Sequence, residues 1–449
     1  MVGFGTDYCT DTADCGHTTP PLSPGLDAFV RHFASGAKSP DAFRLGFELE
    51  QLITTARGEY VPYGGGVGIE ALLQRLRPRY RETITNDGTA DGRVIGLIRA
   101  DAIITLEPGA QFEYSPPPFT SVDEMRLHLT HFNAEVNEVL RGTGYLRRQL
   151  GYQPLARVDD IELLPKERYR LMDAHFQTSG RYGRNMMRGT ASTQVIVDYS
   201  DPADAIRKLR AACALTPLLG LLTDNSPWFE GGDAPGRMMR TRIWADLDPD
   251  RCGLVPGVFD AGFGFADYAR AVLTHPLVVY MADGVAHDAR GRTAAELYDL
   301  DGLSGTDIDH ILSMFFYDVR LRKYVEIRPA DSLPMPYALA YVALIKGLFY
   351  DAENLERLDG LCAGWNDDTV PEIKAALIAD GYDTPIAHWY PGVGRTAADA
   401  LAELLGCARR ALAADEAAYL DVFDALVRTR TTPAQIAHRR GVVLPLLDQ

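Results

Sequence analysis

Residues 43–54 read FRLGFELEQLIT, a stretch in which apolar and polar residues alternate. This alternation, with aromatic and β-branched residues among the apolar ones, predicts a β-strand. Glu48 and Glu50 stand two positions apart, so both side chains leave the same face of that strand. A strand disfavours glutamate, and burial of an unpaired carboxylate is costly. The stretch therefore predicts either a solvated sheet face or a functional group of carboxylates.

Other segments predict the rest of the sheet and the helices that cover it. We predict further strands within 94–118, at 190–200 and at 319–331. We predict helices at 26–33, within 64–80, at 122–141, 202–222 and 337–350, and through 366–449. Pro217 is expected to kink or end the helix that begins after Asp201. The predicted fold class is α+β, an antiparallel sheet with helices on its outer face.

The chain divides into three parts by composition. Residues 1–40 are rich in Thr, Pro, Gly and Asp and are expected to form an N-terminal leader or arm. No linker rich in Pro, Gly or Ser interrupts 43–350, so residues 41–351 are predicted to form one core. Residues 352–449, rich in Ala and Leu over most of their length, are predicted to form a helical region packed on that core.

Composition also excludes several classes of function. Lys and Arg total 45 and Asp and Glu total 61, giving a net charge of −16, which disfavours non-specific binding to nucleic acid or to an anionic membrane. No run of about 20 apolar residues is present to span a bilayer. The first residues lack the basic start and apolar core of a signal peptide. We therefore expect a cytoplasmic protein, a monomer or homodimer, whose partners are small molecules.

Familiar metal and nucleotide motifs are absent from the sequence. The six cysteines are sparse, and none has the spacing of a zinc site. Cys9 and Cys15 either form a redox-sensitive bridge or belong to a mobile arm. There is no GxxxxGK(S/T), no GxGxxG that opens a helix, no HExxH and no GxSxG. Any nucleotide chemistry must therefore use another architecture.

Acidic residues recur on the predicted strands, and arginines gather elsewhere. Glu107 and Glu113 follow one another on neighbouring strand segments, and Glu326 and Arg328 form a second pair two positions apart. Clustered carboxylates favour a site for divalent metal, because Mg²⁺ takes oxygen ligands and is usually shared with substrate phosphates. Arginines gather in and around segments that we interpret as strands or turns, at 181–189, 236–244 and 248–251. Arginine suits bidentate capture of carboxylate or phosphate, so the set favours a metal–nucleotide enzyme with an acidic substrate.

Seven motifs in order carry a family resemblance. They are GFELE (46–50), ITLEPGAQFEYS (104–115), TASTQVIVDYS (190–200), TDNSPWFEG (223–231), TRIWADLDPDRCGLVP (241–256), GFGFADYA (262–269) and DVRLRKYVEIRPAD (318–331). From about 43 to 351 the chain resembles the glutamate–cysteine ligases of the plant and proteobacterial type, within the carboxylate–amine ligase superfamily. The resemblance implies a glutamine-synthetase-like core with a curved antiparallel sheet, whose concave face holds metal, ATP and amino acid.

The resemblance also implies a reaction and a set of site residues. The expected enzyme uses ATP and Mg²⁺ to phosphorylate the side-chain carboxylate of L-glutamate, and a second amino acid then attacks the γ-glutamyl phosphate. The implied metal ligands are Glu48, Glu50, Glu107, Glu113 and Glu326. Glu326 and Arg328 are the implied catalytic residues, with Arg328 at the transferring phosphate. The implied substrate contacts are Arg240, at the α-carboxylate of glutamate, Arg242 and Trp244, and the implied nucleotide contacts are Gln194 and Arg251.

Two departures from the family pattern leave the acceptor amino acid open. This chain has Ile196 at a position where the family usually has Asn, and Pro329 at a position where the family often has Gly. L-Cysteine, as in glutathione biosynthesis, is the first expectation. The alternatives are a small non-protein amino acid, such as an unsaturated glycine analogue in a natural-product pathway, and a related ligase that uses another acid. A catalytically inactive binding protein is the competing class.

Overall fold

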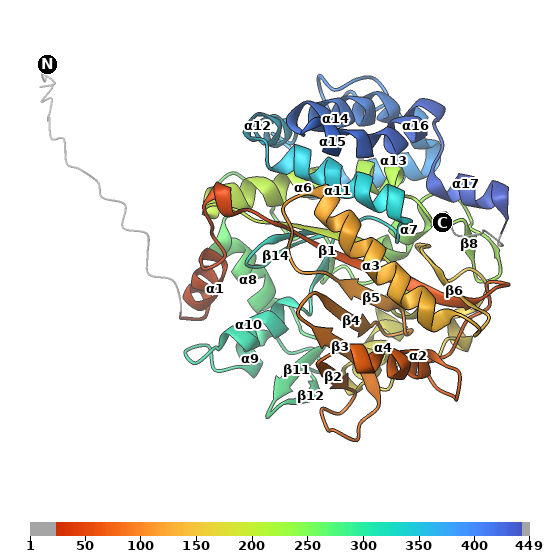
Figure 1. Ribbon diagram of the computed structural model, residues 1–449. Helices are drawn as coiled ribbons and strands as arrows, with labels where there is room; N and C mark the ends of the chain where they lie inside the picture. The colour runs from red at the N-terminus through yellow and green to blue at the C-terminus, as the bar shows by residue number, and fades with distance from the viewer. Residues whose placement is uncertain (1–23, 442–449) are drawn as a thin grey trace, which may run out of the picture.

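The structure is a computed structural model that describes residues 24–441 (Figure 1). Cys9, Cys15 and most of the predicted leader lie outside the described residues. The described part of that leader contains helix α1, Pro24–Ala34, which packs on α8, Phe265–Thr274. The Phe33 ring lies 5.4 Å from that of Phe265, between ring centroids, and is fully buried.

One antiparallel sheet organises the part of the chain that the structure describes, with nine strands in it. Along the sheet the order is β14-β15-β7-β1-β5-β4-β3-β2, and β6 also pairs with β1. The strands are β1 Leu45–Thr55, β2 Glu82–Thr85, β3 Val94–Arg99, β4 Ala102–Leu106, β5 Phe112–Ser115, β6 Tyr145–Arg148, β7 Thr193–Val197, β14 Val319–Leu321 and β15 Val325–Ile327. Three short two-stranded sheets pair β8 (Trp228–Phe229) with β9 (Gly232–Asp233), β10 (Cys252–Gly253) with β13 (Phe316–Tyr317), and β11 (Val279–Ala282) with β12 (Val285–Asp288).

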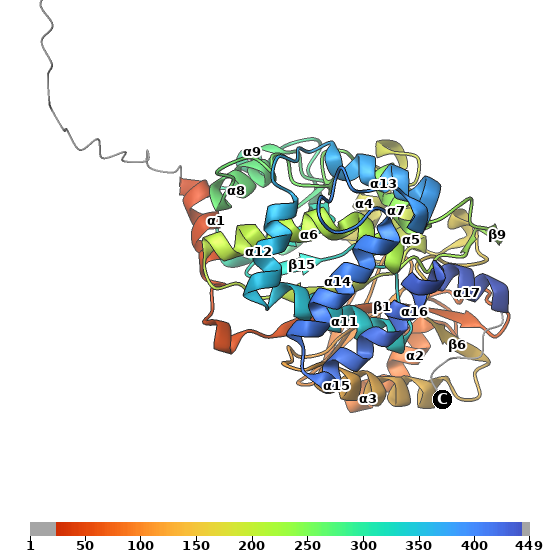
Figure 2. The same ribbon diagram turned by 90° about the horizontal axis from the view of Figure 1, so that it is seen from above.

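Helices cover one side of the sheet in two layers. In Figures 1 and 2, α3, α6 and α11 cross it, and α12 to α16 lie outside them. Besides α1 and α8, the described α-helices are α2 Ile69–Leu76, α3 Val122–Leu140, α4 Glu167–Ser179, α5 Gly183–Gly189, α6 Pro202–Leu222, α7 Met239–Ala245, α9 Ala294–Leu297, α10 Gly305–Leu312, α11 Met335–Phe349, α12 Ala352–Leu361, α13 Thr369–Asp380, α14 Ala397–Ala411, α15 Ala414–Ala417, α16 Asp421–Thr429 and α17 Pro433–Arg440.

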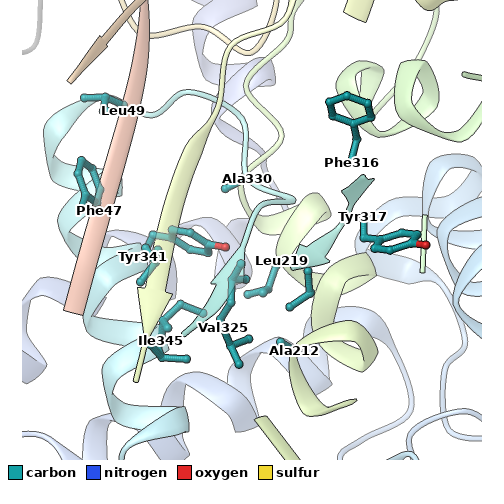
Figure 3. Close-up of a cluster of buried hydrophobic side chains, with 14 of the residues drawn as sticks. Phe47, Leu49, Ala212, Leu219, Phe316, Tyr317, Val325, Ala330, Tyr341 and Ile345 are labelled. Carbon is teal, nitrogen blue, oxygen red and sulfur yellow. The ribbon is translucent and has the colours of Figure 1, made fainter. Parts of the chain in front are cut away.

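The period-2 alternation of the strands separates an apolar face from a polar one. Figure 3 shows Phe47 and Leu49 of β1 on the face toward α11, where Tyr341 and Ile345 are fully buried. Burial of such side chains contributes roughly 1.5–3 kcal/mol each to folding. Because successive side chains leave opposite faces, the same alternation turns Glu48 and Glu50 the other way. The predicted fold class, α+β with an antiparallel sheet and helices on its outer face, is confirmed.

Two local predictions need correction, and one of the two outcomes expected at Pro217 does not occur. Helix α6 does not end there but continues to Leu222. Proline removes the N–H that would bond the Cys213 carbonyl, and the Thr216 hydroxyl donates to that carbonyl instead, at 2.9 Å. Residues 319–331 form a hairpin of β14 and β15, rather than one strand, with Arg320 opposite Glu326. The arginine segments predicted as strand or turn at 181–189 and 236–244 contain helices α5 and α7.

The helices at 122–141 and 202–222 are confirmed to within a residue, as α3 and α6. Ser121 and Asp201 cap them, since each side chain accepts from a backbone N–H three residues on. Among the described helices, none has the length and apolar character needed to cross a membrane.

Candidate functional site

A cavity of about 380 Å³ opens on the polar face of the sheet. Several of the predicted site residues line it, from three strands, one helix and the segments that directly follow β4 and β15. They are Glu48, Glu50, Glu107, Glu113, Gln194, Arg240, Trp244 and Arg328. Glu326 is not among the described lining residues, but it is bonded to two arginines that are, Arg320 and Arg328.

Strand register brings the carboxylates together. Glu50 of β1 lies directly opposite Glu113 of β5, and Glu48 lies opposite Gln194 of β7. Side chains of directly opposed residues share a face of the sheet. Glu107 comes from the turn just after β4, which pairs with β5. The alternation in β1 and the pairing of its neighbours therefore place four carboxylates around one cavity.

For these four carboxylates, burial and mutual repulsion outweigh the positive charges nearby. Burial, and then repulsion from Glu326, raises the pKa of Glu48 to about 7. Burial, and then Glu107, raises the pKa of Glu50 to about 7. The pKa values of Glu107 and Glu113 are raised as well, first by burial. A bound cation would relieve this cost.

Hydrogen bonds fix two of the carboxylates in place. Glu50 accepts from the backbone N–H and the hydroxyl of Ser192, each at 2.8 Å. Glu113 accepts from the Thr105 hydroxyl at 2.5 Å. Both donors belong to strands next to the acceptor, or to the segment leading into one, so the sheet itself orients the carboxylates.

Glu326 has a different environment. Arg320 donates two hydrogen bonds to it, each 2.7 Å, and Arg328 donates a third at 3.1 Å. Burial alone would raise the pKa of Glu326, but Arg320 and Arg328 outweigh burial and hold it below its usual range. In this structure Glu326 is therefore a charged anchor for two arginines, and its oxygens are already occupied.

The two arginines predicted to bind anions, Arg240 and Arg328, both line the cavity. Arg328 also donates to the Gln194 amide oxygen at 2.6 Å. Arg240, on α7, is buried and donates to the backbone carbonyls of Arg328 and Pro329, each at 3.2 Å. Its guanidinium lies 5.5 Å from the Trp244 ring centroid. Trp244 thus packs against the arginine and walls the cavity.

Two other predicted arginines lie apart from the described cavity lining. Arg251 is buried against Asp248, at 2.6 Å, and donates to the Pro276 carbonyl. Arg242 donates to the Pro235 carbonyl at 2.6 Å, on the other side of α7 from Arg240. Each guanidinium donates to a backbone carbonyl of a nearby loop, and neither residue is among the described residues that line the cavity.

Four cations that sequence reasoning missed complete the lining: Lys166, Arg168, Arg320 and Arg322. Burial, and then the charge of Arg168, lowers the pKa of Lys166. Burial, aided by the charges of Arg320 and Arg322, lowers the pKa of Arg168, and Glu107 opposes both shifts. Arg320 and Arg322 stand at the same two-residue spacing as Glu326 and Arg328. This spacing is the sequence signal that could have predicted their place on the polar face. Lys166 directly precedes α4 and Arg168 lies in its first turn, and nothing periodic in the sequence marks them.

The donor set suits a divalent cation by its chemistry. Among residues 24–441, no group of three or more His, Cys, Asp or Glu side chains is arranged so that it could hold a metal ion in this ion-free structure. Nevertheless, the carboxylate oxygens of the half-buried Glu48, Glu50, Glu107 and Glu113 are hard ligands with raised pKa values. These four residues fit Mg²⁺, whereas Glu326 is already paired with arginine.

Comparison with known proteins gives consistent results. A family model described as glutamate-cysteine ligase family 2 matches residues 44–443, which extends past the predicted boundary at 351. A chloroplastic glutamate–cysteine ligase of Arabidopsis thaliana is 34% identical over 433 residues, covering 93% of this chain and 79% of the relative. That of Brassica juncea is 33% identical, with coverages of 93% and 80%.

A solved structure shares the fold. It is a glutamate–cysteine ligase from Francisella tularensis in complex with AMP, with a TM-score of 0.54 at 13% identity. The match covers 89% of this chain and 86% of that one. At this identity the likeness concerns the fold alone.

Proposed function

The chain belongs to glutamate-cysteine ligase family 2, and from that membership we propose that it is an ATP-dependent γ-glutamyl ligase. In this proposal it activates L-glutamate as γ-glutamyl phosphate and couples it to the amino group of a small amino acid. L-Cysteine is the first candidate, because the plant relatives are named glutamate–cysteine ligases. The proposed location is cytoplasmic, although those relatives are named as chloroplastic enzymes.

The observation that carries the proposal is the charge pattern of the cavity. Four carboxylates with raised pKa values lie on one sheet face, beside a group of arginines and a lysine. Phosphoryl transfer to a carboxylate brings mutually repelling anions together, so the site must supply positive charge at the transferring group. Mg²⁺, held by the four carboxylates, would neutralise phosphate charge when bound.

Protein residues would position the first step. In our proposal Arg240 binds the α-carboxylate of glutamate from the cavity lining. Arg328, held between Gln194 and Glu326, stabilises charge on the transferring phosphoryl group. An oxygen of the glutamate γ-carboxylate attacks the γ-phosphorus of ATP, and ADP leaves with the bonding electrons. Lys166, Arg168, Arg320 and Arg322 supply the remaining positive charge for the polyphosphate.

The second step forms the amide. The acceptor amine attacks the acyl carbon of γ-glutamyl phosphate, inorganic phosphate leaves, and the amine loses a proton. Arg328 would stabilise the departing phosphate, as it does the incoming one. Water must be excluded from the acyl phosphate during this step, because it would hydrolyse the intermediate. Trp244 and Phe316, whose ring centroids are 6.5 Å apart, line the cavity with apolar surface that would help to exclude it.

A second acceptor class rests on one departure from the family pattern, at a sheet position that is not among the described cavity-lining residues. Ile196 lies opposite Gly46 and Glu326 in the register, on the polar face, where the family usually has Asn. An apolar side chain there suits an acceptor with a carbon side chain, such as an unsaturated glycine analogue. One methylene-sized change alters discrimination by only about 1–3 kcal/mol, so few substitutions would change the acceptor.

The test measures ADP formation from ATP, Mg²⁺ and L-glutamate with a panel of amino acids. We expect ADP release that needs both glutamate and an acceptor, and a γ-glutamyl dipeptide by mass spectrometry. Varying the acid at a fixed acceptor distinguishes a ligase for another acid. Comparing kcat/KM for cysteine with that for 2-aminobutyrate and propargylglycine distinguishes the two acceptor classes. ATP binding with no turnover for any pair would mean a binding protein and would contradict the proposal.

A further inference from the structure

One buried polar side chain of the cavity lining, that of Gln111, has no part in the chemistry proposed above. Gln111 ends the turn between β4 and β5 and is 2% exposed. Its amide oxygen accepts a hydrogen bond from the Gly109 backbone N–H at 2.7 Å. Its amide nitrogen donates to the backbone carbonyls of Thr190, at 2.8 Å, and Met187, at 3.3 Å. Both ends of the amide are therefore bonded to the backbone of the protein.

The turn that Gln111 ends is the one that carries Glu107. The Glu107 N–H donates to the Gln111 carbonyl at 3.0 Å, and the Glu107 carbonyl accepts from the Ala110 N–H at 2.8 Å. On either side of the turn, Leu106 and Phe112 form the last pair of the ladder between β4 and β5. Because the turn holds the Glu107 backbone at both its N–H and its carbonyl, the conformation of the turn determines where the Glu107 carboxylate lies.

This turn is strained, and it packs closely against α5. Ala110 has a left-handed backbone conformation with φ of 62°, which a residue other than glycine keeps only where the surrounding structure holds it. A Cβ added at Gly109 would lie 2.2 Å from the Arg188 carbonyl oxygen, so the turn touches the end of α5 directly. The Gln111 amide spans this contact, since its oxygen bonds the turn and its nitrogen bonds the end of α5.

Both sides of this contact belong to the cavity. Met187 and Thr190 line it from the end of α5, and Glu107 lines it from the turn. The Gln111 amide therefore joins two parts of the cavity lining that are about 80 residues apart in the sequence, as its hydrogen bonds to Met187 and Thr190 show. Without this link, the strained turn would lose one of the contacts that fix it, and the Glu107 carboxylate would be free to move with it.

We infer that Gln111 is a positioning residue for Glu107. Its amide fixes the turn at 107–111 to the end of α5 and so holds the Glu107 carboxylate where it binds a divalent cation together with the other three carboxylates of the cavity. The inference rests on the proposed function, in which these four carboxylates hold Mg²⁺. Gln111 acts through the backbone of the turn, because both ends of its own amide are already bonded.

The test measures binding of Mn²⁺ alone by electron paramagnetic resonance, without nucleotide or turnover, since Mn²⁺ takes the same oxygen ligands as Mg²⁺. Gln111→Met keeps the length of the side chain and removes both hydrogen-bonding groups of the amide. Gln111→Asn keeps an amide that is one methylene too short to span the contact. We expect each change to weaken Mn²⁺ binding about tenfold, as changes to groups that support metal ligands do.

Gln153→Met is the matched control. Gln153 is also buried, and its side-chain oxygen also accepts from a backbone N–H two residues away, that of Leu155 at 3.2 Å. It is not among the described residues that line the cavity. This change should therefore leave Mn²⁺ binding as in the wild type.

A double variant shows whether Gln111 acts through Glu107. Glu107→Gln alone should weaken Mn²⁺ binding, and adding Gln111→Met to it should weaken binding no further, because the carboxylate that Gln111 positions is already gone. Hydrogen exchange of the amides at 107–111 should also be faster in Gln111→Met than in the wild type or in Gln153→Met.

Unchanged Mn²⁺ binding in both single Gln111 variants would overturn the positioning role. Losses that add in the double variant would overturn it as well, because Gln111 would then act independently of Glu107. A wild-type chain that binds no Mn²⁺ is a different result, which would overturn the metal site of the proposed function itself.

Discussion

Glu50 and Glu113 lie directly opposite each other on β1 and β5, two carboxylates facing one cavity. Like charges in directly opposed positions destabilise a sheet. Burial adds to this cost, as the raised pKa values of both groups indicate. The arrangement is therefore costly for the fold, and a cation that binds both groups would compensate for it.

The first prediction follows from this cost. Glu113→Gln should abolish ligase activity and yet raise the free energy of unfolding of the metal-free protein, by about 1–3 kcal/mol at pH 8, because it removes a crowded charge. Urea unfolding in the presence of a chelator measures this change. Glu82→Gln, an exposed strand glutamate, is the control and should change stability by less than about 0.5 kcal/mol. A destabilised Glu113→Gln protein would contradict the account.

The second prediction concerns pH. Glu48 and Glu50 have folded-state pKa values of about 7, above the value of about 4.3 for an unfolded glutamate. The folded state therefore holds more protons, so metal-free stability should fall as pH rises from about 4.3 to about 7 and level off above. Glu326 has the opposite shift, and its contribution is lost only below that window.

Denaturant midpoints between pH 5 and pH 8, with and without MgCl₂, measure this dependence. We expect Mg²⁺ to stabilise the protein more at pH 8 than at pH 5, because it must displace protons at the lower pH. Glu48→Gln should flatten the metal-free profile. Equal stabilisation by Mg²⁺ at both pH values would be inconsistent with these carboxylates as the ligands.

The third prediction concerns the Arg320–Glu326 pair, which is bonded twice at 2.7 Å and largely buried. Arg320→Ala should destabilise the protein by about 3–5 kcal/mol, since it leaves a buried carboxylate short of its main partner. It should also reduce kcat, because Arg328, which stabilises the transferring phosphoryl group in our proposal, then becomes the main ion-pair partner of Glu326. The exposed pair Arg79–Glu138 provides the control, and Arg79→Ala should cost about 1 kcal/mol or less in the same unfolding assay.

The fourth prediction separates nucleotide from amino acid. Lys166→Ala should raise KM for ATP roughly tenfold while KM for glutamate stays within about twofold, because the lysine belongs to the cations proposed for the polyphosphate. Arg170→Ala, an exposed neighbour paired with Glu167, should leave both constants unchanged. A rise in KM for glutamate alone would place the polyphosphate elsewhere in the cavity.

Local patterns in the sequence predicted the polar sheet face well. The spacing of Glu48 and Glu50 determines that they share a face, whatever the neighbouring strands are. Which strands are neighbours is a long-range property, so the pairing of β15 with β7, and of Glu326 with Arg320, was not predictable from spacing. The turn at 322–324 contains no Gly or Pro, and the hairpin there was therefore interpreted as one strand.

Arginine positions were harder to predict than carboxylates. Arg251 and Arg240 occur in similar Arg-rich segments, yet Arg251 pairs with Asp248 three residues earlier, and Arg240 reaches the cavity. Lys166 reaches the cavity from a loop that only tertiary packing places there. Arginine and lysine are long and flexible, so their partners depend on packing more than on local sequence.

The most direct test of the central claim follows an oxygen atom. L-Glutamate labelled with ¹⁸O in its γ-carboxylate is converted with ATP, Mg²⁺ and the best acceptor, and the inorganic phosphate is analysed by mass spectrometry. If this cavity phosphorylates the γ-carboxylate, one ¹⁸O per turnover should appear in inorganic phosphate. Phosphate without ¹⁸O, or label recovered in AMP, would contradict activation through γ-glutamyl phosphate.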